Sequence, residues 1–100
     1  MIDQPCSDAI CREMSGEMED MARWLSGGGL SPEQFRLSLT ELEGRKLQRF
    51  GLKMTSSVSA SKIVHFTLRF VETGEFCSSM NVDPATGAMS VQHACALAPR

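Results

Sequence analysis

The chain has 100 residues, a length that fits one domain with a single hydrophobic core. Its apolar fraction of 42% is typical of a globular protein, and its longest apolar runs are far too short for a membrane-spanning helix. A formal net charge of −2 argues against a general attraction to nucleic acid or to acidic membranes.

The charge is unevenly distributed along the chain. Residues 1–25 contain six acidic and two basic residues, whereas residues 31–70 contain three acidic and seven basic residues. Acidic and basic segments of this kind predict two oppositely charged surfaces on one domain.

The N-terminal segment predicts an amphipathic helix over residues 7–26. Ser7 is a suitable N-cap, and the carboxylate of Asp8 favours the positive end of a helix. Apolar residues then recur every three or four positions, at Ile10, Met14, Met18, Met21 and Leu25. The glycines of residues 27–29 end the helix and serve as a linker.

The next segment supports two interpretations. Ser31 followed by Pro32 is typical of a helix start. The apolar residues Phe35, Leu37 and Leu39, however, alternate with polar residues, which is the period of a β-strand. We favour a short turn followed by a strand over residues 35–42, with a turn at residues 43–44, and keep a helix over residues 32–47 as the alternative.

The remainder of the chain predicts antiparallel hairpins. Residues 72–74 form a short loop with Gly74 at a position that needs a left-handed conformation, and residues 83–87 form a second turn. Pairing Phe70 with Phe76 and Val82 with Met89 brings the apolar residues of successive strands onto one face. The expected core comprises Leu52, Phe66, Leu68, Phe70, Met80 and Val91, covered by Met14, Met18 and Met21.

Together these patterns predict a single α+β domain over residues 1–100. An N-terminal amphipathic helix packs on one face of a four- to five-stranded antiparallel β-meander that extends over about residues 35–97. Similar helix-on-meander layouts occur in protease inhibitors, chaperones of secreted proteins and small phage-encoded inhibitors, but an analogy of fold does not determine function.

The four cysteines support only weak chemical hypotheses. The first residues lack the basic and apolar regions of a signal peptide, so we expect a cytoplasmic protein with four reduced thiols. The strand phase places Cys77 on the outer face beside Arg69, where a cation activates a thiol. A zinc site would use Cys6, Cys11, His93 and Cys95, whose spacing departs from the usual zinc motifs.

The predicted outer face of the sheet is basic and is the candidate binding surface. Its six candidate residues are Arg36, Arg49, Lys53, His65, Arg69 and Asn81. The phenylalanines fall on or beside the inner face, so the surface lacks the aromatic platforms that bind single-stranded nucleic acid. Trp24 lies beside the apolar stripe of the helix, where it covers the edge of the core or, less often, anchors a partner.

The sequence contains no catalytic motif, and we expect a non-enzymatic protein without a cofactor. The leading hypothesis is a small inhibitor or adaptor that occupies the surface of an acidic protein partner. A homodimer formed through an edge strand at residues 35–42 or 88–97 is a further expectation. The alternatives are a single-stranded nucleic-acid-binding protein and a zinc- or thiol-dependent activity.

Overall fold

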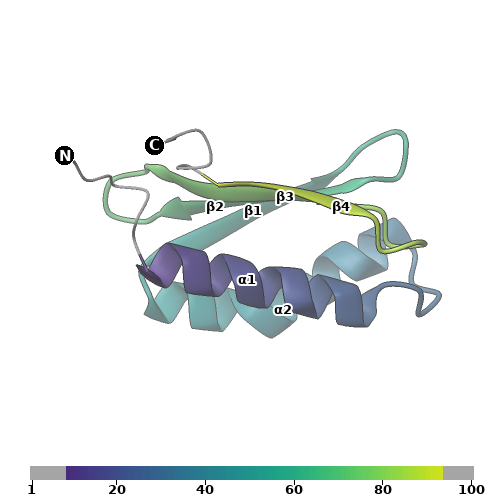
Figure 1. Cartoon of the computed structure of the whole chain (residues 1–100), viewed down its shortest axis with the longest axis horizontal. Coiled ribbons are helices and arrows are strands. Elements are labelled where there is room, and N and C mark those ends of the chain that lie inside the picture. The colour runs from purple at the N-terminus through teal and green to yellow at the C-terminus, as the bar shows by residue number, and fades with distance from the viewer. Residues whose placement is uncertain (1–8, 94–100) are drawn as a thin grey trace.

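The computed structural model describes residues 9–93, which form two layers: a pair of helices and a four-stranded sheet (Figure 1). Both helices lie on the same face of the sheet, and within the described residues the opposite face carries no second layer. The elements are α1 (Ala9–Leu25), α2 (Pro32–Arg49), β1 (Leu52–Val58), β2 (Val64–Phe70), β3 (Phe76–Val82) and β4 (Met89–His93). The predicted α+β class, the N-terminal helix and the antiparallel sheet are confirmed.

Helix α1 packs mainly on β3 and on its neighbour α2. Met14 and Met18 are buried, and Met21 and Leu25 pack at the border of the core, as the predicted stripe requires. Ile10, at the start of the stripe, is exposed instead. The buried face of α1 also contains the small residues Ser15 and Ala22, which allow a close approach to the sheet.

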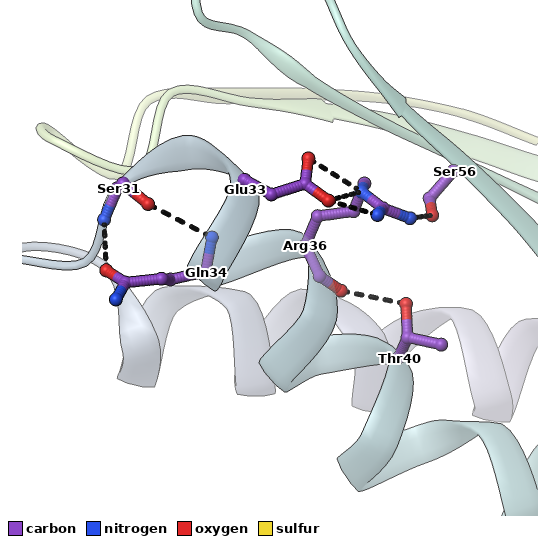
Figure 2. A network of polar contacts seen from close by, with 6 residues as sticks. All are labelled: Ser31, Glu33, Gln34, Arg36, Thr40 and Ser56. Carbon is purple, nitrogen blue, oxygen red and sulfur yellow. Dashed lines mark hydrogen bonds and ion pairs between the residues drawn. The ribbon is translucent and has the colours of Figure 1, made fainter.

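Segment 35–42 is helical, so the predicted strand and the turn at residues 43–44 are wrong. Ser31 caps α2 through its hydroxyl, which accepts a hydrogen bond from the Gln34 backbone N–H at 3.2 Å, and the Gln34 side chain reciprocally accepts from the Ser31 N–H at 3.0 Å (Figure 2). This capping box, with Pro32 in the first turn, outweighs the local alternation of apolar residues. Leu37, which the strand prediction placed in the core, is 49% exposed.

The four strands follow one another in the order β1-β2-β3-β4, and all neighbouring pairs are antiparallel. The predicted pairs Val82–Met89, Met80–Val91 and Phe66–Met80 are confirmed. The pairing of Phe70 with Phe76 is wrong, because the register shifts and Phe76 pairs with Arg69. Strands β1 and β4 are the edges of the sheet.

The register shift changes the direction of one side chain. Leu68 pairs with Ser78 and Arg69 pairs with Phe76, so Cys77 is the extra residue of a β-bulge. Cys77 and Ser78 are consecutive in β3 and both are buried, which regular alternation forbids. Cys77 therefore faces the helices, and the prediction that it lies on the outer face beside Arg69 is wrong.

The core lies between the helical layer and the inner face of the sheet. Phe35 and Leu39 of α2 and Phe66 of β2 are at its centre, where the two phenylalanine rings pack with centroids 6.4 Å apart. Leu52, Leu68 and Met80 are buried as predicted, whereas Phe70 and Val91 pack at its border.

A buried disulfide joins Cys11 of α1 to Cys77 of β3 across 66 residues of sequence. The prediction of four reduced thiols is thus wrong for this pair, and Cys77 has no free thiol for nucleophilic chemistry. Nearby, the Ser15 hydroxyl donates a hydrogen bond to the Ser78 hydroxyl at 3.0 Å inside the core. Both contacts hold α1 against the same strand.

Candidate interaction surfaces

The open face of the sheet carries four of the six candidate binding residues. Lys53 lies directly opposite Arg69 on neighbouring strands, and His65 lies opposite Asn81. The His65 Nδ1 atom contacts the Asn81 carboxamide oxygen, and the Asn81 amide donates to the Ser90 hydroxyl at 3.5 Å. These residues form a polar face, and the positive charges of Lys53 and Arg69 lie at one end of it.

The other two candidate residues lie elsewhere. Arg49 is the last residue of α2, in the helical layer. Arg36 binds the carboxylate of Glu33 one turn earlier on the same helix and donates a hydrogen bond from Nη1 to the Ser56 hydroxyl of β1 at 3.1 Å (Figure 2). The Glu33 carboxylate raises the pKa of Arg36. The six predicted residues therefore do not share one surface: four lie on the open face, and Arg36 and Arg49 lie near opposite ends of α2.

The open face offers little for base stacking. Among residues 9–93, Phe76 is the one aromatic residue whose cross-strand partner belongs to this face: it pairs with Arg69. The Arg69 guanidinium lies over the Phe76 ring, 5.8 Å from the centroid. A ring already covered by a cation is not a free stacking platform. Phe76 is therefore occupied by an intramolecular contact in this structure.

A second surface lies on the outside of the helical layer. The single tryptophan of the chain, Trp24, is 75% exposed beside Met21 of α1 and Leu42 of α2. Together with Glu17 and Asp20 these residues line an apolar hollow of about 460 Å³, which we term the Trp24 hollow. This exposure is not that of a residue that covers the edge of the core. It agrees better with the other interpretation of the sequence, in which Trp24 anchors a partner.

The Trp24 hollow has a charged rim. The Lys46 ammonium of α2 binds the Glu17 carboxylate at 2.6 Å, which lowers the pKa of Glu17. On the outer side, Asp20 accepts a hydrogen bond from Arg23 at 3.3 Å, and both side chains are exposed. The exposed Asp20–Arg23 pair contributes little to stability.

Sequence reasoning missed Glu43, which is buried between the two helices. It occupies the core face of α2 with Phe35, Leu39 and Leu47, yet it is only 3% exposed and its Oε1 atom has no hydrogen-bond partner among the described residues. Burial first, and then the hydrogen bond and charge of Glu17, raise the pKa of Glu43 to about 7, against the opposing charge of Lys46. The spacing of four residues from Phe35 to Leu39, Glu43 and Leu47 was the signal in the sequence that could have placed Glu43 on the buried face of a helix.

A further hollow of about 550 Å³ lies at the end of the molecule where α2 meets β1. It is lined by residues of the α2–β1 connection and of the β2–β3 hairpin, among them the exposed side chains of Phe50 and Val71. Its charged lining residues are Glu72 and Glu75. The expectation that every phenylalanine falls on or beside the inner face of the sheet is therefore wrong for Phe50, which follows α2 and is exposed.

The residues of the predicted zinc site are not brought together in the described part of the chain. Cys11 is consumed by the disulfide, the side chain of His93 and all of Cys6 and Cys95 lie outside the described residues, and residues 9–93 contain no cluster suited to a metal ion. In the same range, neither helix has the length and apolar character needed to cross a membrane.

Comparison with known proteins does not assign the chain to a family. No family model, curated protein or solved structure matches it significantly.

Proposed function

We propose that this protein is a non-catalytic binding module that engages a protein partner through the Trp24 hollow. The observation that carries the proposal is the exposure of Trp24 next to the apolar side chains of Met21 and Leu42. Tryptophan is costly to leave in water and is among the residues most enriched at the energetic centres of protein interfaces. A hollow beside it provides room for an apolar side chain of the partner.

The lining of the hollow favours a partner of particular chemistry. Its only charged lining residues within the described chain are the acids Glu17 and Asp20, and the side chain of Asp20 is 82% exposed at the rim. A segment that presents an apolar side chain next to a lysine or arginine is complementary to this arrangement. Helix α1, which contributes most of the lining, carries four acidic and two basic residues, so its net charge favours the same partner.

Replacing Trp24 with alanine tests this proposal. Loss of a central tryptophan is expected to weaken partner binding by roughly 2–4 kcal/mol, about 30-fold or more in Kd. The fold should be unaffected, because the Trp24 side chain lies mostly in solvent. Partners recovered with the wild-type protein are titrated against both forms, and burial of the single tryptophan is followed by its fluorescence.

Val71→Ala is the matched control, since Val71 is also an exposed apolar residue but lies in the other hollow. It should bind with wild-type affinity. A partner that binds Trp24→Ala as tightly as wild type and loses affinity for Val71→Ala would show that the hollow at the α2–β1 end is the binding site.

The open face of the sheet supports a second candidate, the binding of an acidic protein. Lys53 and Arg69 are direct cross-strand neighbours, and the outward-facing positions of the strands within residues 52–92 contain no acidic residue. Strands β1 and β4 are the edges of the sheet formed by residues 9–93, and an edge strand is suited to strand addition or to a homodimer. The edge predicted at residues 35–42 is helical and plays no part in this candidate.

Reversing both charges, with Lys53→Glu and Arg69→Glu, tests the second candidate. Association with an acidic partner should slow at least about tenfold at low ionic strength and much less at high salt, because exposed charges act by long-range attraction. Stopped-flow or surface-binding kinetics measure the effect, and Glu13→Lys on α1 is the control. An unchanged association rate for the sheet variant, with a changed rate for the control, would favour the helical layer.

The disulfide supports a compartment other than the reducing cytoplasm. Stable buried disulfides are typical of proteins that fold in oxidising environments, whereas the expectation of reduced cysteines followed from an assumed cytoplasmic location. A partner outside the reducing cytoplasm is therefore part of the proposal.

A further inference from the structure

Glu43 occupies a position that ordinarily requires an apolar side chain. It is buried at the interface of α1 and α2, and its Oε1 atom lacks a hydrogen-bond partner in the described part of the chain. An ionised carboxylate in such a place is strongly disfavoured unless it is paired, whereas a neutral carboxylic acid is tolerated. The protonation state of Glu43 therefore determines how well the two helices fit together.

The charged groups around Glu43 come from both helices. Helix α1 contributes Glu17, which interacts directly with Glu43, and α2 contributes Lys46, which is bound to Glu17. Glu13 of α1 also acts on Lys46 from further away. The inward-facing positions of β1, β2 and β3 carry no acidic or basic residue. Lys46 alone must balance the two carboxyl groups when both are ionised.

We propose that Glu43, Glu17 and Lys46 form a pH-sensitive latch between α1 and α2 that controls the Trp24 hollow. Glu17 connects the two sites, because it lines the hollow with Trp24 and also interacts with Glu43. With Glu43 neutral, the Glu17–Lys46 pair is balanced and the helices are closely packed. With Glu43 ionised, two neighbouring carboxylates repel each other and loosen α1 from α2 beside the hollow. The hollow is thus preformed at acidic pH and loosened at alkaline pH.

The pH range follows from the pKa of Glu43. Its value in the folded protein, about 7, lies above its ordinary value of 4.5, so the folded state holds a proton that the unfolded chain has released. The resulting stabilisation is fully present below pH 4.5 and is lost as the pH rises through 7. The unfolding equilibrium constant should increase on the order of 100-fold across this range.

The experiment is a pH titration of the whole protein without a partner, from pH 4.5 to pH 9. Trp24 fluorescence and its quenching by acrylamide report on the hollow, while carbon NMR of the glutamate carboxyl groups reports directly on the ionisation of Glu43. Both signals should change together with a midpoint near pH 7. In Glu43→Gln, the fluorescence change should be absent and the protein should remain folded at all these pH values.

Two further variants are expected to move the midpoint in opposite directions. Glu17→Gln removes a neighbouring negative charge and should lower the midpoint, whereas Lys46→Gln removes the positive charge and should raise it. The controls are Glu41→Gln, an exposed acid on α2, and His65→Gln, on the open face of the sheet. Neither control should change the midpoint.

A Glu43 carboxyl group that titrates near 4.5 would overturn the proposal. So would a midpoint near 7 by NMR with no change in Trp24 fluorescence, because the latch would then be uncoupled from the hollow. The regulatory role rests on the proposed function of the hollow, but this titration uses no partner. Loss of the latch and loss of binding in Trp24→Ala are therefore separate outcomes.

Discussion

Replacing Cys11 and Cys77 with alanine should lower the free energy of unfolding by about 4 kcal/mol. The disulfide links residues that are 66 positions apart in the sequence. A cross-link over a loop of that size lowers the conformational entropy of the unfolded chain, which stabilises the folded state by about 4 kcal/mol. Small domains have total stabilities of only about 5–15 kcal/mol, so the variant should be close to unfolding at 37 °C. Urea denaturation of the wild-type and variant proteins measures the difference.

A reducing agent provides the matched control for the disulfide. It should lower the urea midpoint of the wild-type protein towards that of the Cys11→Ala/Cys77→Ala variant and leave the variant unchanged. Peptide mapping of the unreduced protein should recover a fragment that joins α1 to β3. A wild-type protein whose stability is indifferent to reduction would contradict the structure at this point.

Phe66→Ala should cost about 3–5 kcal/mol, the range expected for removing a buried phenylalanine side chain. Phe66 is 1% exposed at the centre of β2, where it packs against Phe35 of α2 and joins the sheet to the helical layer. Alanine leaves a cavity that a close-packed interior only partly fills. Equilibrium denaturation in urea, with unchanged m-values, measures the loss.

Phe50→Ala is the control, because Phe50 is largely accessible to solvent at the end of α2. Its removal should cost much less than that of Phe66, as expected for a side chain that is 44% exposed and lies outside the core. Equal losses for the two variants would show that β2 does not place Phe66 between the layers as described.

Much of the sheet was predictable because its strand phases and hairpin pairings depend on residues that are close together in the sequence. Inner and outer residues alternate along β2 and β4, and the turns at residues 72–74 and 83–87 set the spacing of their hairpins. Gly74 adopts a φ of 75°, as the predicted loop requires. The pairs Phe66–Met80 and Val82–Met89 followed from those turns. Four positions of the open face, Lys53, His65, Arg69 and Asn81, followed from the same alternation.

Helix α2 was mispredicted for an identifiable reason. Its buried residues Phe35, Leu39, Glu43 and Leu47 are spaced by four, but one of them is an acid, so the helical period was broken at the third position. The alternation of Phe35, Leu37 and Leu39 then resembled a strand. Leu37 and Leu42 are apolar residues of α2 that are exposed to solvent. Local sequence patterns do not predict that an apolar residue will be exposed.

The sequence by itself determined the amphipathic first helix, the turns and the phase of most strands, since each depends on neighbours within a few residues. Only the tertiary structure decided the partner of Cys77, the environment of Glu43 and the exposure of Trp24. A single-residue bulge turned Cys77 inward, where the packing of α1 brought Cys11 to it from 66 positions away. Glu43 meets Glu17, and Trp24 meets Leu42, only because α1 packs against α2. Contacts between distant segments depend on how whole elements pack, and no local period encodes that packing.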